Sequence, residues 1–136
     1  MTKQDDPIAF LRRVCEKPGM YVVSRRFDAV WSFIEGYDVA HERRPLWGFR
    51  EWLSMSREDW TNAPWFVLVR ERVFSGETRV DWVPDEHEHA PLIGETRRLL
   101  GEFGAARTAL GVEALLGQYQ AWEDAHGAKR RLENAT

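Results

Sequence analysis

The side chains best suited to chemistry in this chain of 136 residues are one cysteine, four histidines and the acidic residues near them. Cys15 could act as a nucleophile if a histidine lay beside it, because that pairing generates the thiolate. Its position falls on the apolar side of a predicted helix, however, and free cysteine is among the most buried residue types. The sequence therefore predicts a core cysteine and no essential thiol.

A second candidate is the acidic run 85–89, which contains His87 and His89. In an extended segment, this alternate spacing would direct both imidazoles to one side, as a metal site requires. No cysteine or paired His–Glu spacing elsewhere completes a ligand set, and a defined site needs all of its ligands. The sequence predicts a solvated acidic loop, with no metal and no other cofactor.

His41 is the third candidate, at the end of a long predicted helix, with Asp38 about one turn away and with Glu42 and Glu35 as further acidic neighbours. A salt-bridged helix end is the commoner arrangement, because the helix dipole favours positive charge there. An apolar pocket with a few converging polar groups is nevertheless the usual ligand site. One alternative therefore stays open, a small-molecule-binding domain or enzyme whose aromatic pocket consists of Tyr21, Trp31, Tyr37 and His41.

Seven tryptophans are the most unusual feature of the composition, and each such side chain buries on the order of 150–250 Å². Trp31, Trp52 and Trp122 occupy helical positions that suit a core. The other four lie at segment ends or in loops, where tryptophan can line an interface: Trp47, Trp60, Trp65 and Trp82. We predict that at least one of these four is exposed beside arginine and acidic side chains and contacts a protein partner.

The elements that must position these residues are helices, because apolar residues recur at helical spacing through most of the chain. The pattern predicts an all-α, compact single-domain bundle of five to six helices over residues 1–136, with a polar tail that frays from about 124. The second helix is apolar over more than half of its circumference, so we expect it at the centre, with Gly36 and Ala40 allowing close approach. Helices are predicted over about 7–16, 25–42, 46–55, 65–74, 91 to 101 or 104, and from 112 onward.

Local signals add detail at several boundaries. Asp6 and Pro7 suit a helix start, and Ser24 can cap the second helix. The apolar run 65–69 fits a buried strand or a buried helix, and the flanking proline and glycine favour a helix. Segment 56–59 predicts a short helix or turn that carries Trp60.

Pro18 and Gly19 predict a type II turn with positive φ at Gly19. Residues 20–21 should then pack against the first two helices, with a short extended segment near 20–23 or 78–83.

The charge balance narrows the class of partner. With 22 acidic and 19 basic residues the formal net charge is −3, which is too balanced to draw the chain to nucleic acid or to an anionic membrane. Neither an apolar stretch of signal-peptide length at the start nor a run of about 18 apolar residues occurs, so we expect a cytoplasmic protein.

Two sequence patterns resemble known proteins. Residues 16–21 resemble the segment before the ATP-binding helix of the DNA gyrase B subunit, but that family's Asn/Asp-bearing helix and glycine-rich lid are not recognisable, so ATPase function is rejected. Segments 17–21, 33–37, 48–53 and 64–65 together resemble a group of small bacterial proteins, some of them associated with toxin-immunity neighbourhoods. Val23 stands where a typical member has glycine. The compact size, the absence of a specific catalytic set, the abundance of tryptophan and arginine, and this resemblance together predict a non-enzymatic protein that binds another protein, such as the neutraliser of a bacterial toxin.

Overall fold

The computed structural model describes residues 6–74 and 84–135, with residues from 128 onward described by their backbone alone. Within these ranges the chain forms six α-helices, one short 3₁₀ helix and no strand, which confirms the predicted all-α class. The elements are α1 (Pro7–Glu16), η2 (Pro18–Met20), α2 (Phe27–Ala40), α3 (Phe49–Ser54), α4 (Trp65–Val73), α5 (His89–Leu110) and α6 (Val112–Ala135).

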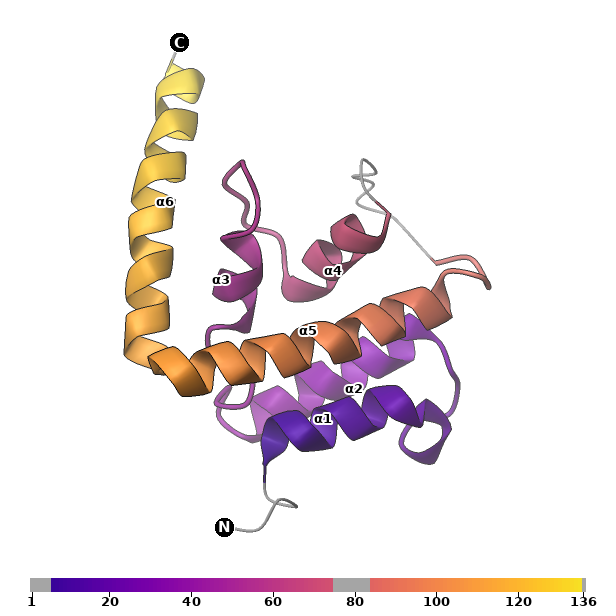
Figure 1. The fold of residues 1–136 in the computed structure, drawn as a ribbon. Helices are drawn as coiled ribbons and strands as arrows, with labels where there is room; N and C mark the ends of the chain where they lie inside the picture. The colour runs from indigo at the N-terminus through magenta and orange to yellow at the C-terminus, as the bar shows by residue number, and fades with distance from the viewer. Residues whose placement is uncertain (1–5, 75–83, 136) are drawn as a thin grey trace.

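Helix α5 is the centre of the bundle. In Figure 1, α1 and α2 lie along one side of α5, α3 and α4 lie on the other, and α6 rises steeply from its C-terminal end. Helix α5 contacts each of the other five α-helices, whereas α2 packs mainly on α1 and α5. The prediction that α2 is central is therefore wrong: part of its apolar circumference faces outward, where Gly36 and Ala40 are exposed.

Two glycines let α1 and α5 approach closely. A Cβ atom on Gly101 would lie 3.1 Å from the Arg12 guanidinium, and one on Gly104 would lie 3.1 Å from Ile8 Cγ2. The prediction that α5 ends near one of these glycines is wrong, because tertiary packing on α1 outweighs the low helix propensity of glycine. The predicted close approach at Gly36 is also absent, since no described atom of another element lies within 4 Å of a Cβ placed there.

A buried histidine from α5 caps the first turn of α2. The backbone N–H of Phe27 donates to His89 Nδ1 at 2.8 Å, and both side chains are buried. The ring proton of this histidine must then reside on Nε2, which is buried without a hydrogen-bond partner in the described part of the chain. The prediction that Ser24 caps α2 is wrong, because the helix begins two residues later than expected and Arg26 occupies the N-cap.

The segment after α1 differs from its prediction. Residues 18–20 form η2, in which Met20 N donates to Lys17 O at 3.0 Å and Tyr21 N donates to Pro18 O at 2.9 Å. Because these successive bonds keep the backbone right-handed, Gly19 does not adopt the positive φ of a type II turn. Met20 is 72% exposed instead of packed, while Tyr21 packs edge-on against Phe10.

No strand forms at 20–23, where η2 ends at Met20 and a turn and bends follow, and segment 78–83 lies outside the described residues. Residues 65–73 are helical, as the flanking residues indicated, and 56–59 form a turn and bends without a helix. Helix α6 continues to Ala135, through the stretch for which a polar, frayed tail is predicted.

Candidate functional site

The loop between α2 and α3 has an unusual backbone. Glu42 N donates to Val39 O at 3.2 Å and Arg43 N donates to Asp38 O at 2.7 Å, the two bonds of a Schellman motif. Glycine usually occupies the left-handed position of this motif, but here both Glu42 and Arg43 have φ of 60°. Left-handed backbone at such residues costs about 1–2 kcal/mol each, so surrounding contacts must hold the loop in this conformation.

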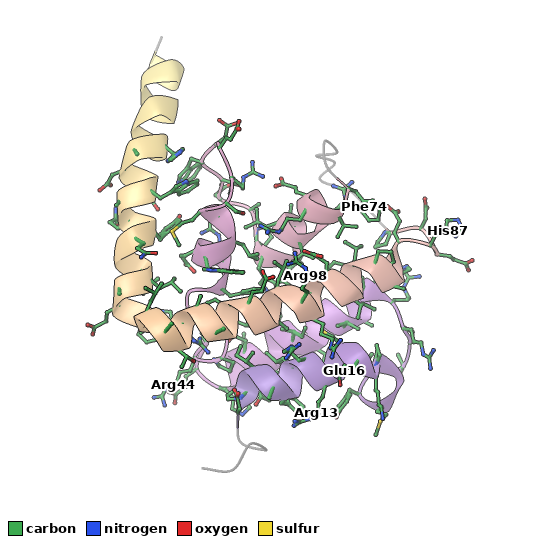
Figure 2. All side chains as sticks on the ribbon, viewed as in Figure 1. Arg13, Glu16, Arg44, Phe74, His87 and Arg98 are labelled. Atoms are coloured by element: carbon green, nitrogen blue, oxygen red, sulfur yellow. The ribbon has the colours of Figure 1, made fainter. Side chains whose placement is uncertain are left out.

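Those contacts come from Asp38 and Arg107. The buried carboxylate of Asp38 accepts a hydrogen bond from Leu46 N at 2.9 Å. In addition, Arg107 Nη1 lies within 3.0–3.2 Å of three loop carbonyl oxygens, those of Arg44, Pro45 and Trp47. Burial lowers the pKa of Arg107, and the charges of Asp6 and Asp38 oppose that shift, so the guanidinium keeps its charge. Arg44 marks this loop near the C-terminal end of α5 in Figure 2.

A glycine completes the loop. Gly48 has φ of 91°, and a Cβ atom there would lie 3.2 Å from Leu115 Cδ2 and 3.7 Å from Phe103 Cε1. A larger residue would therefore be strained and would crowd both α5 and α6. Gly48 directly precedes α3, so it sets the direction in which the chain leaves Trp47.

This loop presents Trp47 at the edge of a cleft of about 300 Å³. The Trp47 side chain is 52% exposed. The cleft lies between the C-terminal half of α2, the start of α3 and the start of α4. Its charged lining residues are Glu35, Asp38, Arg43, Arg50 and Glu51. One of the four candidate interface tryptophans thus lies at the surface beside arginine and acidic side chains, and we call this site the Trp47 cleft.

Hydrogen bonds hold the walls of the Trp47 cleft in place. Arg50 donates to Ala63 O at 3.0 Å and to Thr61 O at 2.9 Å, and its Nη1 lies 3.5 Å from the Tyr119 hydroxyl. Burial raises the pKa of Tyr119. Two other lining residues are joined as well, since Trp65 Nε1 donates to Glu35 Oε1 at 2.5 Å. A wall whose side chains are already ordered loses little conformational entropy when a partner binds.

The remaining candidate interface tryptophans are distributed differently. Trp65 is 5% exposed, and it lines the Trp47 cleft from below the surface. Trp60 is partly buried and lies next to α6, where a Cβ on Gly127 would be 3.7 Å from its Cδ1. Trp82 lies outside the described residues. Among the described members of this set, Trp47 is therefore the one whose side chain is largely exposed to solvent.

The alternative aromatic pocket is only partly assembled. Tyr21 and Tyr37 both pack on Phe10, with ring centroids 5.6 and 5.0 Å away, and His41 stacks on Tyr37 at 4.1 Å. Trp31 lies elsewhere, stacked on Phe66 with centroids 3.9 Å apart. These rings fill the space between one another, and none of the four residues lines the Trp47 cleft or the two larger clefts on α5.

The histidines do not form a shared site. His87 is exposed and points away from the bundle in Figure 2, whereas His89 is buried and bonded to Phe27 N. The alternation expected of an extended segment fails because a turn precedes His89 and α5 begins there. His41 Nδ1 donates to the Tyr37 carbonyl at 2.9 Å. Within the described ranges, no three metal-ligating side chains cluster.

Cys15 lies in the core between α1 and α5, as the sequence predicted. Burial raises the pKa of its thiol to about 12, although the charges of Arg97 and Arg12 act in the opposite direction. The native thiol should therefore react with Ellman's reagent at pH 8 at least about a hundredfold more slowly than the thiol of the urea-unfolded chain, because the thiolate is the reactive form. A time course of absorbance at 412 nm measures both rates, and equally rapid labelling of the two states would contradict this prediction.

Arg107 and Gly48, which support the loop that carries Trp47, are residues that we did not predict from the sequence. Arg107 acts on backbone more than fifty residues earlier in the chain, and no local pattern marks such a contact. Gly48 carried a local signal, since a glycine directly after a turn region marks a position that tolerates positive φ.

No family model, curated protein or solved structure matches this chain. None of the helices in the described residues combines the length and the apolar character that a membrane span requires.

Proposed function

We propose that this protein is a non-enzymatic binding protein that recognises a partner protein through the Trp47 cleft. The observation that carries the proposal is the half-exposed indole of Trp47, on a loop whose backbone Asp38 and Arg107 hold by hydrogen bonds. Interface hot spots are enriched in tryptophan and arginine, and Arg43 and Arg50 line the same cleft. A braced indole offers a large contact area at little cost in entropy.

A protein partner fits the charges of the Trp47 cleft better than nucleic acid does. Glu35 and Glu51 lie among its lining residues, and their carboxylates would repel phosphates. The resemblance of the first half of the chain to toxin-immunity proteins supports a more specific form of the proposal, in which the partner is a bacterial toxin and binding neutralises it. We also propose a cytoplasmic location, because a single buried thiol is compatible with a reducing compartment.

Replacing Trp47 with alanine should weaken partner binding by about 2 kcal/mol or more, roughly thirtyfold in Kd, because a hot-spot indole is lost. Folding should be nearly unchanged, since about half of this side chain is already exposed in the free protein. A pull-down from the native host followed by calorimetric titration of the captured protein measures the loss, and a thermal melt measures folding.

The matched control for this experiment is Leu110→Ala. Leu110 is also an exposed large apolar residue, at 45%, but it lies at the end of α5 outside the Trp47 cleft. We expect the control to bind as the wild type does. Equal capture of the partner by the Trp47→Ala variant would overturn the proposed site. Recovery of a small molecule in place of any protein would favour the aromatic-pocket alternative.

A further inference from the structure

A second and larger cleft lies near the N-terminal end of α5. It has a volume of about 810 Å³ and lies between the end of α1, η2 and the first turns of α5. Helices α1 and α5 run antiparallel, since Glu16 pairs with Arg97 while Ile8 packs at Gly104. This cleft therefore lies toward the opposite end of α5 from Arg107 and the Trp47 loop. Glu16 at its margin is labelled in Figure 2.

The charged residues around this cleft are mainly basic. Lys17, Arg25 and Arg97 line it together with one carboxylate, that of Glu16. Arg97 forms an ion pair with Glu16. Lys17 and Arg25 have no carboxylate partner in residues 6–74 and 84–127. Both of these side chains are exposed, so two positive charges are available to an incoming anion without breaking an existing pair.

The same cleft has apolar surface beside its charges. Ile93 and Cys15 are 6% exposed each and belong to the core beneath it. Met20, which also lines the cleft, is 72% exposed. Methionine is unbranched and adapts its shape to different apolar groups, which suits it to contact side chains of a bound segment.

We propose that this cleft binds an extended acidic segment of a partner protein, with carboxylates on Lys17 and Arg25 and an apolar side chain against Met20 and Ile93. The surplus of basic side chains is complementary to carboxylates. A volume of about 810 Å³ exceeds what a simple inorganic anion fills. A flat bilayer would meet the margin but could not reach the apolar floor of a concave cleft. This site is independent of the Trp47 cleft and of the function proposed for it.

The test is an NMR titration of the ¹⁵N-labelled full chain with a blocked peptide of sequence Glu-Leu-Glu-Leu-Glu. We expect saturable shifts of backbone amides in 15–25 and 90–97, and weaker binding at higher salt because exposed charges are screened. The Arg25→Glu variant should lose affinity by about tenfold, since one attraction becomes a repulsion. Arg44→Glu introduces the same charge change at the other end of the bundle, where the Arg44 side chain is 78% exposed, and should bind as the wild type does.

Three comparison titrations make the outcome decisive. A Lys-Leu-Lys-Leu-Lys peptide should cause no saturable shift at these amides. Sodium phosphate at equal concentration should not reproduce the shifts, and an equal effect would reduce the site to one for simple anions, overturning the proposal. Binding to vesicles containing phosphatidylserine, with no response to the acidic peptide, would overturn it in favour of a membrane surface. Unchanged affinity in Arg25→Glu, with a wild-type circular dichroism spectrum, would also overturn it.

Discussion

Replacing Phe49 with alanine is expected to destabilise the protein by about 3–5 kcal/mol, the range for deleting a fully buried phenyl ring. Phe49 is 0% exposed and is surrounded by other rings. Its ring centroid lies 5.1 Å from that of Phe103, 5.6 Å from Trp65 and 6.4 Å from Trp52. These rings belong to three helices, so the cavity left by truncation cannot close without moving α4 or α5. The free-energy cost of this cavity therefore adds to the transfer free energy that is lost with the phenyl ring.

Urea denaturation followed by circular dichroism measures this loss as a lower midpoint at an unchanged slope. The Phe49→Leu variant is the matched control, because it keeps most of the apolar volume and should cost clearly less. A loss below about 1 kcal/mol in Phe49→Ala would contradict a buried aromatic junction of α3, α4 and α5, since such small losses are typical of surface substitutions.

The parts of the fold that the sequence predicted are those set by local chemistry. Helix α1 spans 7–16 as expected, because Asp6 caps it and Pro7 occupies its first turn. The apolar run 65–69 was ambiguous between strand and helix, and the flanking proline and glycine resolved it toward the helix that forms. Periodicity alone also predicted that the second helix is largely apolar, and Val30 and Ile34 of α2 are fully buried.

The predictions that failed depended on contacts between distant segments. Gly101 and Gly104 resemble helix ends in isolation, but in the structure they are the surface on which α1 packs. The start of α2 is set by His89, sixty-two residues away, and not by a neighbouring serine. Trp31 was expected in the core. It is only partly buried, stacked on Phe66, so its removal should cost less than that of Phe49.

In the candidate site, too, local sequence was informative, whereas contacts between distant segments were not predicted. A tryptophan at the edge of a predicted helix is a reasonable interface candidate, and the sequence indicated Trp47 among four. Which of the four is exposed depends on tertiary packing, which buries Trp65 against Phe49 and leaves Trp47 outside. Asp38 was considered only as a neighbour of His41, because its bond to Leu46 N arises from the left-handed turn after α2.

Replacing Asp38 with alanine should destabilise the protein by about 3 kcal/mol, the upper end for a hydrogen bond to a charged group, because the buried Leu46 N–H loses its acceptor. Leu46 directly precedes Trp47, so release of its amide should also loosen the loop at Glu42 and Arg43. These residues hold φ of 60° only under constraint. Partner binding should therefore weaken, although Asp38 is only 4% exposed and offers a partner little surface.

Amide hydrogen exchange at Leu46 separates this explanation from a general loss of stability. In the wild type, we expect this amide to exchange only when the whole bundle unfolds, because its acceptor is buried. In Asp38→Ala it should exchange far faster than amides in the middle of α5, whereas a uniform acceleration would indicate global destabilisation alone. Val39→Ala is the matched control: Val39 is the next residue along α2 and is 53% exposed, so its truncation should leave both the Leu46 amide and partner binding unchanged. A Leu46 amide that stays protected in Asp38→Ala would contradict the role assigned to this carboxylate in holding Trp47 at the surface.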